Sequence, residues 1–149
     1  GVGAPTLSRN TGMPRKDAQK LLDAFWSRNW SVEEVASKVK TKQAFDGMWL
    51  QNPVSKFWYS LRSEKDRFST LNQGTGVFCF DSWVKLCVEQ GIHTVGQFHD
   101  EVIAVVEKGK EQETKVKMVK AIDQLNDNLK LNVPLGVDAQ FGKTYADIH

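Results

Sequence analysis

Cysteine is scarce in this sequence and long apolar runs are absent from it, which excludes several classes of protein. Cys79 and Cys87 are the two cysteines among 149 residues. They are too few for a disulfide scaffold or a zinc cluster and indicate a reduced, intracellular setting. No apolar run approaches the roughly 18 residues of a membrane span, so we expect no membrane partner. Residues 1–15 also lack the apolar core of a secretory signal peptide.

The remaining composition is that of a globular protein whose charges are unevenly distributed. Apolar residues make up 40% and aromatic residues 10% of the chain, which excludes a disordered, collagen-like or coiled-coil protein. The net charge of +2 is the sum of a net charge of +5 over residues 1–70 and a net charge of −3 over residues 71–149. This division is compatible with a polyanion bound to the first part and cations bound to the second. A solvated surface with chance asymmetry explains it equally well.

Helical periodicity dominates the first part of the chain. Apolar residues at positions 18, 21, 22, 25 and 26 have the spacing of one buried face and predict a helix over residues 14–26, with a proline in its first turn. Ser31 and Glu34 form a capping-box pattern that predicts a second helix. A longer helix is expected from residue 63 to about residue 89. The other segments are predicted as a loop over residues 1–12 and as short strands or loop over residues 45–61.

The last part of the chain mixes strand and helix patterns. Residues 94–98 and 102–106 are two β-rich runs with a short polar turn between them, which predicts a hairpin. An amphipathic helix is expected over residues 116–129, and residues 133–141 alternate with the period of a half-buried strand. The predicted class is therefore α+β, with helices packed on an antiparallel sheet.

The turn of the predicted hairpin, Gln97–Glu101, carries the most informative chemistry. Asp100 and Glu101 place two carboxylates at the tip of strands that emerge from a hydrophobic core. Proteins usually hold Mg²⁺ with one or two carboxylates, and phosphoryl transfer uses two such ions. His99 is a candidate general base, phosphate contact or plain turn residue. The alternative for the whole run is an ordinary solvated turn.

A second run, Leu71–Gly76, lies in the long predicted helix. Gln73 has an amide that is able to read the acceptor edges of bases. The two glycines of the run indicate either a break in the helix or a close approach by a bulky group. Upstream of the run, Lys65 and Arg67 are candidates for phosphate contacts. Taken alone, the pattern favours a packed, glycine-interrupted helix.

Together these runs resemble the C-terminal portion of family A DNA polymerases, the bacterial polymerase I and bacteriophage type. In that family a Gln-x-His-Asp-Glu segment forms a palm hairpin, matched by Gln97–Glu101, and an earlier helix carries Gln-Gly-Thr, matched by Gln73–Thr75. The opening Gly1–Ser8 resembles the segment after the family's fingers helix, and residues 141–149 resemble the C-terminus of phage members. The resemblance spans essentially the whole chain. It implies part of a right-hand polymerase fold, with the end of the fingers and connecting helices over residues 1–62 and a palm with a metal-binding hairpin over residues 63–149.

The resemblance implies a role for each matched residue. Asp100 is implied to be a catalytic metal ligand, with Glu101 as a supporting acidic residue, and His99 is implied to contact the primer terminus. Gln73 is implied to reach the minor groove of the duplex near the insertion site. Two further DNA-binding positions depart from the family pattern: Ser69 stands where Asn is usual, and Lys65 stands where Arg is frequent, which loses the bidentate fork.

The resemblance also implies that these residues hold only part of an active site. The family's other metal-binding Asp and its nucleotide-binding fingers helix lie upstream of the matched segment. One aspartate cannot hold two Mg²⁺ ions against a triphosphate. We therefore expect a fragment or a separate subunit, inactive alone, whose partners are an N-terminal polymerase part, primer-template DNA and deoxynucleoside triphosphates. The expected compartment is the cytoplasm, or the host cytoplasm if the source is viral.

Two other functions stay open at this point. A non-catalytic DNA-binding or assembly module derived from a polymerase would keep the same fold. The intact His99–Glu101 run disfavours it, because clustered negative charge repels phosphate. An independent His-Asp metal phosphohydrolase would need more ligands than His93, His99 and His149 supply.

Overall fold

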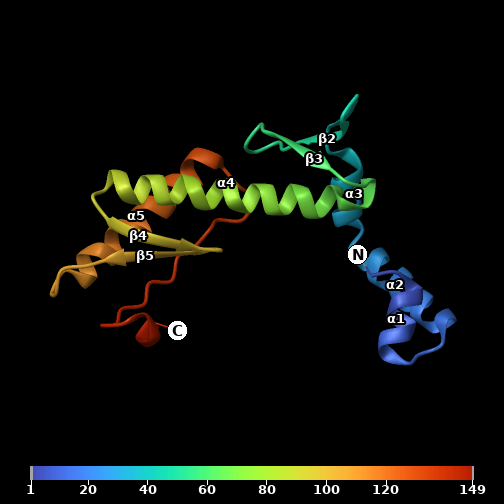
Figure 1. Ribbon diagram of the computed structural model, residues 1–149, viewed down its shortest axis with the longest axis horizontal. Helices are drawn as coiled ribbons and strands as arrows, with labels where there is room; N and C mark the ends of the chain where they lie inside the picture. The colour runs from blue at the N-terminus through green and yellow to red at the C-terminus, as the bar shows by residue number, and fades with distance from the viewer. Residues whose placement is uncertain (1, 149) are drawn as a thin grey trace. The chain divides into compact units, whose positions relative to one another are not determined.

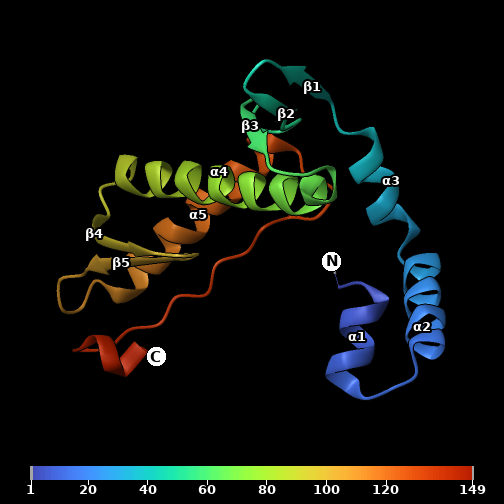
Figure 2. The same cartoon turned by 45° about the vertical axis from the view of Figure 1, so that its right-hand side comes forward.

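The computed structural model describes residues 2–148 and confirms the predicted α+β class. The chain forms helices and two small antiparallel sheets, whose elements are labelled in Figures 1 and 2. It divides into two compact units, Gly1–Thr75 and Gly76–His149, whose boundary falls inside helix α4 (Arg67–Glu89). Each unit has a hydrophobic core of its own. Within residues 2–148, no helix combines the length and the apolar character that crossing a membrane requires.

The first unit begins with helices α1 (Ala4–Thr11), α2 (Arg15–Arg28) and α3 (Trp30–Lys38). The prediction of a loop over residues 1–12 is wrong, because Gly3, Pro5 and Gly12 lie at the ends of α1. Gly3 is the N-cap, and Pro5 occupies the first turn, where its fixed φ favours a helix. Gly12 ends the helix in the left-handed conformation, with φ 74°. Here glycine and proline delimit a helix.

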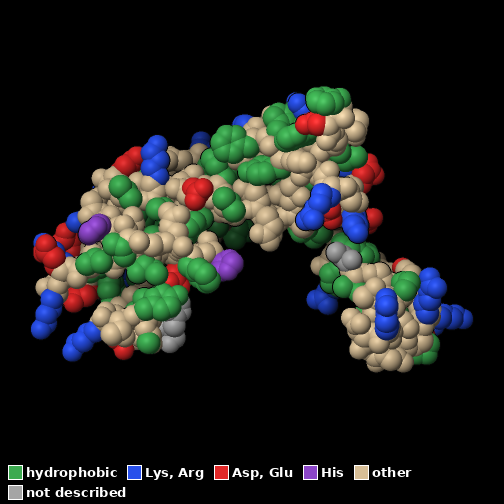
Figure 3. Space-filling view, viewed as in Figure 1, with side chains coloured by type: hydrophobic (Ala, Val, Ile, Leu, Met, Phe, Trp, Pro, Cys, Tyr) green, Lys and Arg blue, Asp and Glu red, His purple; other side chains and the backbone are tan. Residues whose placement is uncertain are grey.

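Helix α2 confirms the helix predicted over residues 14–26 but not its predicted buried face. Ala18 is buried, whereas Leu21, Phe25 and Trp26 are 52%, 53% and 39% exposed. The packing of α1 against α2 therefore covers the small residue of the stripe and leaves Leu21, Phe25 and Trp26 at the surface. Lys and Arg side chains project from these two helices on the face shown in Figure 3.

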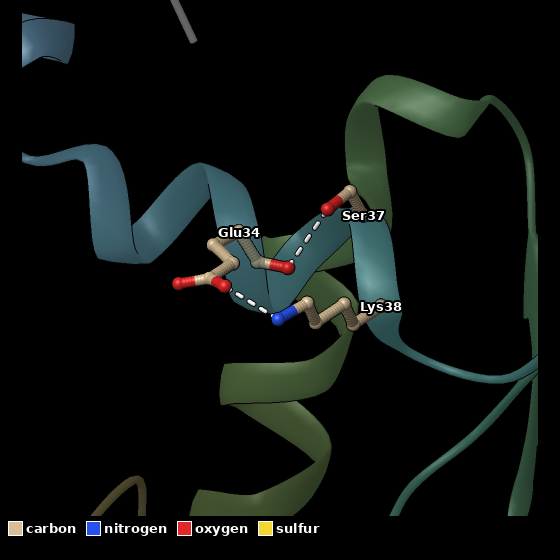
Figure 4. Close-up of polar contacts among 3 residues, drawn as sticks. All are labelled: Glu34, Ser37 and Lys38. Atoms are coloured by element: carbon tan, nitrogen blue, oxygen red, sulfur yellow. Dashed lines mark hydrogen bonds and ion pairs between the residues drawn. The ribbon is translucent and has the colours of Figure 1, made fainter.

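The capping box predicted at Ser31 and Glu34 is not formed. A single residue, Asn29, separates α2 from α3, so Ser31 lies inside the first turn of α3 and not at its cap. Glu34 instead pairs with Lys38 one turn later. The Ser37 hydroxyl donates a hydrogen bond to the carbonyl oxygen of Glu34 at 2.8 Å (Figure 4).

Three antiparallel strands complete the first unit: β1 (Thr41–Ala44), β2 (Gly47–Gln51) and β3 (Trp58–Leu61), paired in chain order. Residues 45–61 were predicted as short strands or loop, and the structure shows that they contain the strands β2 and β3. Strand alternation sends Leu50 and Leu61 to one face of the sheet, where they pack with Leu71 of α4. The sheet thereby supports the first turns of α4, which carry one of the candidate sites.

The second unit is built on the rest of α4 and confirms three predicted elements. A short 3-10 turn (Glu64–Asp66) leads into α4, and the hairpin of β4 (His93–Phe98) and β5 (Glu101–Val105) and the helix α5 (Glu111–Leu129) follow it. Figures 1 and 2 show α5 alongside the C-terminal part of α4. The core between these elements includes Trp83, Cys87, Met118 and Ile122, with Val102 and Ala104 of β5 packed against it.

Both cysteines lie in this core and serve as packing residues. Cys79 and Cys87 are buried and not bridged, as their positions on one helix predict. Burial raises the pKa of the Cys87 thiol to about 11 and also raises the pKa of Cys79. Both thiols therefore stay protonated near neutral pH, without the thiolate character of a nucleophile.

Residues 133–141 do not form the predicted strand, although part of their alternation is confirmed. Leu135, Val137 and Ala139 are half-buried and pack against the core of the second unit. The backbone of Leu135 bonds to a side chain and not to another strand. Its N–H donates to Asn126 Oδ1 at 2.8 Å, and its carbonyl accepts from Asn126 Nδ2 at 2.9 Å. The segment keeps the burial pattern of a strand without a strand partner.

Candidate active site

The β4–β5 hairpin turns through two residues, His99 and Asp100. Phe98 and Glu101 are the last paired residues on either side of this turn. An irregularity in the pairing between Thr94 and Gly96 lets one strand carry an extra residue, and such bulges change the direction of the residues beyond them. Because β5 packs against the core of the second unit, the tip is fixed at its base.

His99 holds an uncommon backbone conformation at the tip. Its φ is 54°, in the left-handed region that non-glycine residues rarely adopt. Its ring meets the ring of Phe98 edge to face, with the centroids 4.6 Å apart. His99 and Asp100 are both exposed, and Glu101 is half-buried. A positive φ is usual at a central residue of a two-residue hairpin turn. The tip is the strongest candidate in the second unit because it presents an exposed imidazole and an exposed carboxylate side by side.

The carboxylates of the tip fit a cation only as part of a larger site. Asp100 and Glu101 are adjacent, and residues 2–148 contain no group of three or more His, Cys, Asp or Glu side chains able to hold a metal. His93 lies at the opposite end of β4, about 20 Å along the strand from His99. This donor set suits Mg²⁺, which commonly takes one or two carboxylates and completes its shell with water and phosphate oxygens.

In the first unit, the candidate DNA-binding residues lie along an exposed face of α4. Ser69 and Gln73 are four residues apart on the helix, so they share a face, and both are exposed. Lys65 precedes them in the 3-10 turn and is exposed as well. The Ser69 hydroxyl donates to the carbonyl oxygen of Asp66 at 3.0 Å, a local bond that leaves its face open to solvent.

Arg67 differs from Lys65 in its surroundings. Its guanidinium pairs with Glu64 at 2.8 Å, and its side chain is 22% exposed. Its Nε is buried and has no hydrogen-bond partner within residues 2–148. Of the two predicted phosphate contacts, Lys65 is therefore the more accessible.

Two residues that the sequence did not single out hold this helix face in place. The ring of Tyr59 lies against Gly74, where an added Cβ would be 2.8 Å from Tyr59 Cζ. The buried side chain of Asn52 donates to the Leu71 carbonyl at 3.3 Å and to Thr75 Oγ1 at 2.8 Å. The glycine was a usable signal, because it indicated either a break in the helix or a close approach by a bulky group, and the structure shows the second. Asn52 gave only the turn signal of an Asn-Pro pair.

The structure thus gathers the predicted residues within each unit. His99, Asp100 and Glu101 are consecutive at the hairpin tip of the second unit, and Lys65, Ser69 and Gln73 follow one exposed face in the first. No protein-family model matches this sequence.

Proposed function

We propose that this chain is the C-terminal part of a template-directed DNA polymerase. In this proposal it supplies one metal-binding aspartate and part of the primer-template contacts for deoxynucleotidyl transfer in DNA replication. The observation that carries the proposal is the hairpin tip, where the exposed side chains of His99 and Asp100 are adjacent to the carboxylate of Glu101. Strand β5, which follows the tip, packs against the core of the second unit.

Each residue of the site has a chemical task in this proposal. The Asp100 carboxylate holds Mg²⁺, and Glu101 adds negative charge beside it. Bound Mg²⁺ supplies stabilisation of the charge that develops on the phosphate oxygens during transfer. His99, exposed beside Asp100, orients the primer terminus.

The α4 face supplies the contacts to the duplex. The Gln73 amide donates to the acceptors of the minor groove, which are present at every base pair. Lys65 neutralises a backbone phosphate, which positions the duplex without reading its sequence. Sequence-independent binding of this kind is what a polymerase needs, because it must copy every template sequence.

The proposal requires residues from outside this chain. A second carboxylate and a nucleotide-binding helix are needed, because Asp100 and Glu101 alone cannot hold two metal ions and a triphosphate. The proposed partners are therefore an N-terminal polymerase part, primer-template DNA and deoxynucleoside triphosphates.

The test is the change Asp100→Asn in the polymerase assembled with its N-terminal part. Loss of residues that merely support a metal ligand already costs 10- to 100-fold, so loss of the ligand should lower primer extension by more than about 100-fold. Affinity for primer-template DNA should stay close to that of the wild type. Asp81→Asn is the matched control, since Asp81 is an exposed aspartate of the same unit on α4.

The same experiment separates the proposal from a non-catalytic DNA-binding module. Extension at the wild-type rate by Asp100→Asn would remove the metal-ligand assignment. Salt-sensitive duplex binding with no extension by the wild type and no dependence on Mg²⁺ would favour the module.

A further inference from the structure

The side chain of Asn52 has all of its hydrogen-bonding groups satisfied, and it joins two elements of the first unit. Asn52 directly follows β2 and is fully buried. Its Oδ1 accepts from the N–H groups of Val54 and Ser55 at 2.8 and 3.0 Å. Its Nδ2 donates to the Leu71 carbonyl and to Thr75 Oγ1 of α4, at 3.3 and 2.8 Å. One amide therefore ties the loop between β2 and β3 to the helix.

Tyr59 adds a second contact on the same side of α4. The three ring carbons nearest to Gly74 would lie 2.8, 3.0 and 3.2 Å from an added Cβ, and the hydroxyl donates to the Gly74 carbonyl at 3.4 Å. The Thr75 hydroxyl also donates to the Leu71 carbonyl at 2.8 Å. Leu71, Gly74 and Thr75 thus form the inward side of the helix.

Gln73 lies between these anchors and is exposed. In the run Gln73-Gly74-Thr75, the first residue faces solvent while the next two are held by Tyr59 and Asn52. We propose that Asn52 is a positioning residue, whose clamp on Leu71 and Thr75 fixes the rotation of α4 that presents Gln73 to the DNA minor groove. This inference rests on the proposed function, since it assigns Asn52 a role in the polymerase site.

Asn126 provides a matched control in the second unit. Its amide donates one hydrogen bond and accepts another, both with the backbone of Leu135. Asn126→Ala therefore removes an asparagine clamp of two hydrogen bonds, one that does not involve the anchors of Gln73. A loss that comes only from lower stability would follow both substitutions.

The first measurement is primer-template affinity in the assembled polymerase. Residues without ligand contact change coupled affinities modestly, so Asn52→Ala should weaken binding by about fivefold. Extension at saturating DNA should stay at the wild-type rate, and Asn126→Ala should leave the affinity unchanged. Combined with Gln73→Ala, Asn52→Ala should add no further loss, because it acts through Gln73.

Thr75 gives a second, milder pair of variants. Thr75→Val keeps the shape of the side chain but removes the acceptor of the Asn52 amide, and it should weaken affinity in the same direction. Thr75→Ser keeps the hydroxyl and should restore wild-type binding. Equal losses in Asn52→Ala and Asn126→Ala, or additive losses with Gln73→Ala, would overturn the positioning role.

Hydrogen exchange of the chain distinguishes a failure of this inference from a failure of the proposed function. Asn52→Ala should speed amide exchange over residues 71–75 of α4, whereas Asn126→Ala should not. Unchanged exchange in Asn52→Ala would refute the clamp even if the protein is a polymerase. Absence of duplex binding by the assembled wild-type protein would refute the role assigned to Gln73, and with it the positioning role, while faster exchange would still support the clamp.

Discussion

Gly74 and Gly76 lie two residues apart on α4 and can be compared directly. Gly74 is packed against another side chain, whereas Gly76 faces open space. An added Cβ at Gly74 would lie within 3.2 Å of three ring carbons of Tyr59, whereas one at Gly76 would meet nothing within 4 Å. Gly76→Ala should raise the free energy of unfolding by about 0.5–1 kcal/mol through helix propensity. Gly74→Ala should lower it by about 1–3 kcal/mol, because the ring must move. Urea unfolding of both variants checks this.

The comparison between the two variants controls for helix propensity, which both gain equally. Stabilisation by Gly74→Ala would show that Tyr59 moves aside at little cost, and it would weaken the account of how α4 is held. The sequence indicated either a break in the helix or a close approach at this residue. It did not indicate Tyr59, because a strand residue 15 positions away meets the glycine only through tertiary packing.

At the level of the element, the β4–β5 hairpin depends on the left-handed backbone of His99. His99→Asn and His99→Ile both lose the edge contact with Phe98, so the difference between them reports the backbone. Asn tolerates φ of 54°, whereas a β-branched residue does not. The Ile variant should be less stable than the Asn variant by about 1–2 kcal/mol, measured by chemical unfolding. Equal stabilities would mean that the turn does not impose this conformation.

Elements whose periodicity agrees with their packing were predictable from sequence. In α5, Ile122 and Leu125 of the expected apolar stripe are buried, and Val102 of the hairpin packs against the same core, because each element turns one face to it. The failures have local causes. Gly3 and Gly12 cap a helix in a stretch that was expected to be a loop, and Pro5 lies in the first turn of that helix. The backbone of Leu135 bonds to Asn126 and not to a strand. Side-chain to backbone bonds of that kind leave no periodic signal.

In the candidate site, too, some residues could be predicted from the sequence and others could not. The hairpin tip was predictable because Gln97–Glu101 combines a turn, two carboxylates and a histidine in one run. The clamp of Asn52 on α4 was not predictable, because Asn52 and Thr75 are 23 residues apart. Nothing in the sequence distinguishes Asn52 from other asparagines in loops. Chemical groups that are adjacent in sequence can be identified from the sequence, whereas residues that contact them from distant positions are identified only from the structure.

Over the whole molecule, charge follows the division into two units. Residues 71–75 carry no charge, so the first unit has the balance of +5 and the second unit the balance of −3. Lys and Arg side chains on α1 and α2 contribute to the first (Figure 3). In the proposed function this places attraction for phosphate on the first unit and the carboxylates for metal on the second. Association with DNA should therefore weaken steeply as salt rises.

The salt dependence of primer-template binding tests this division in the assembled polymerase. Lys65 is exposed and precedes the face of α4 that carries Gln73. Lys65→Ala should therefore remove one phosphate contact. The slope of log affinity against log salt concentration should fall in magnitude by about one. Lys108→Ala removes the same charge from an exposed position of the second unit and should leave the slope unchanged. Equal changes for both lysines would show that only net charge matters. The basic first unit would then attract DNA without holding it at Lys65.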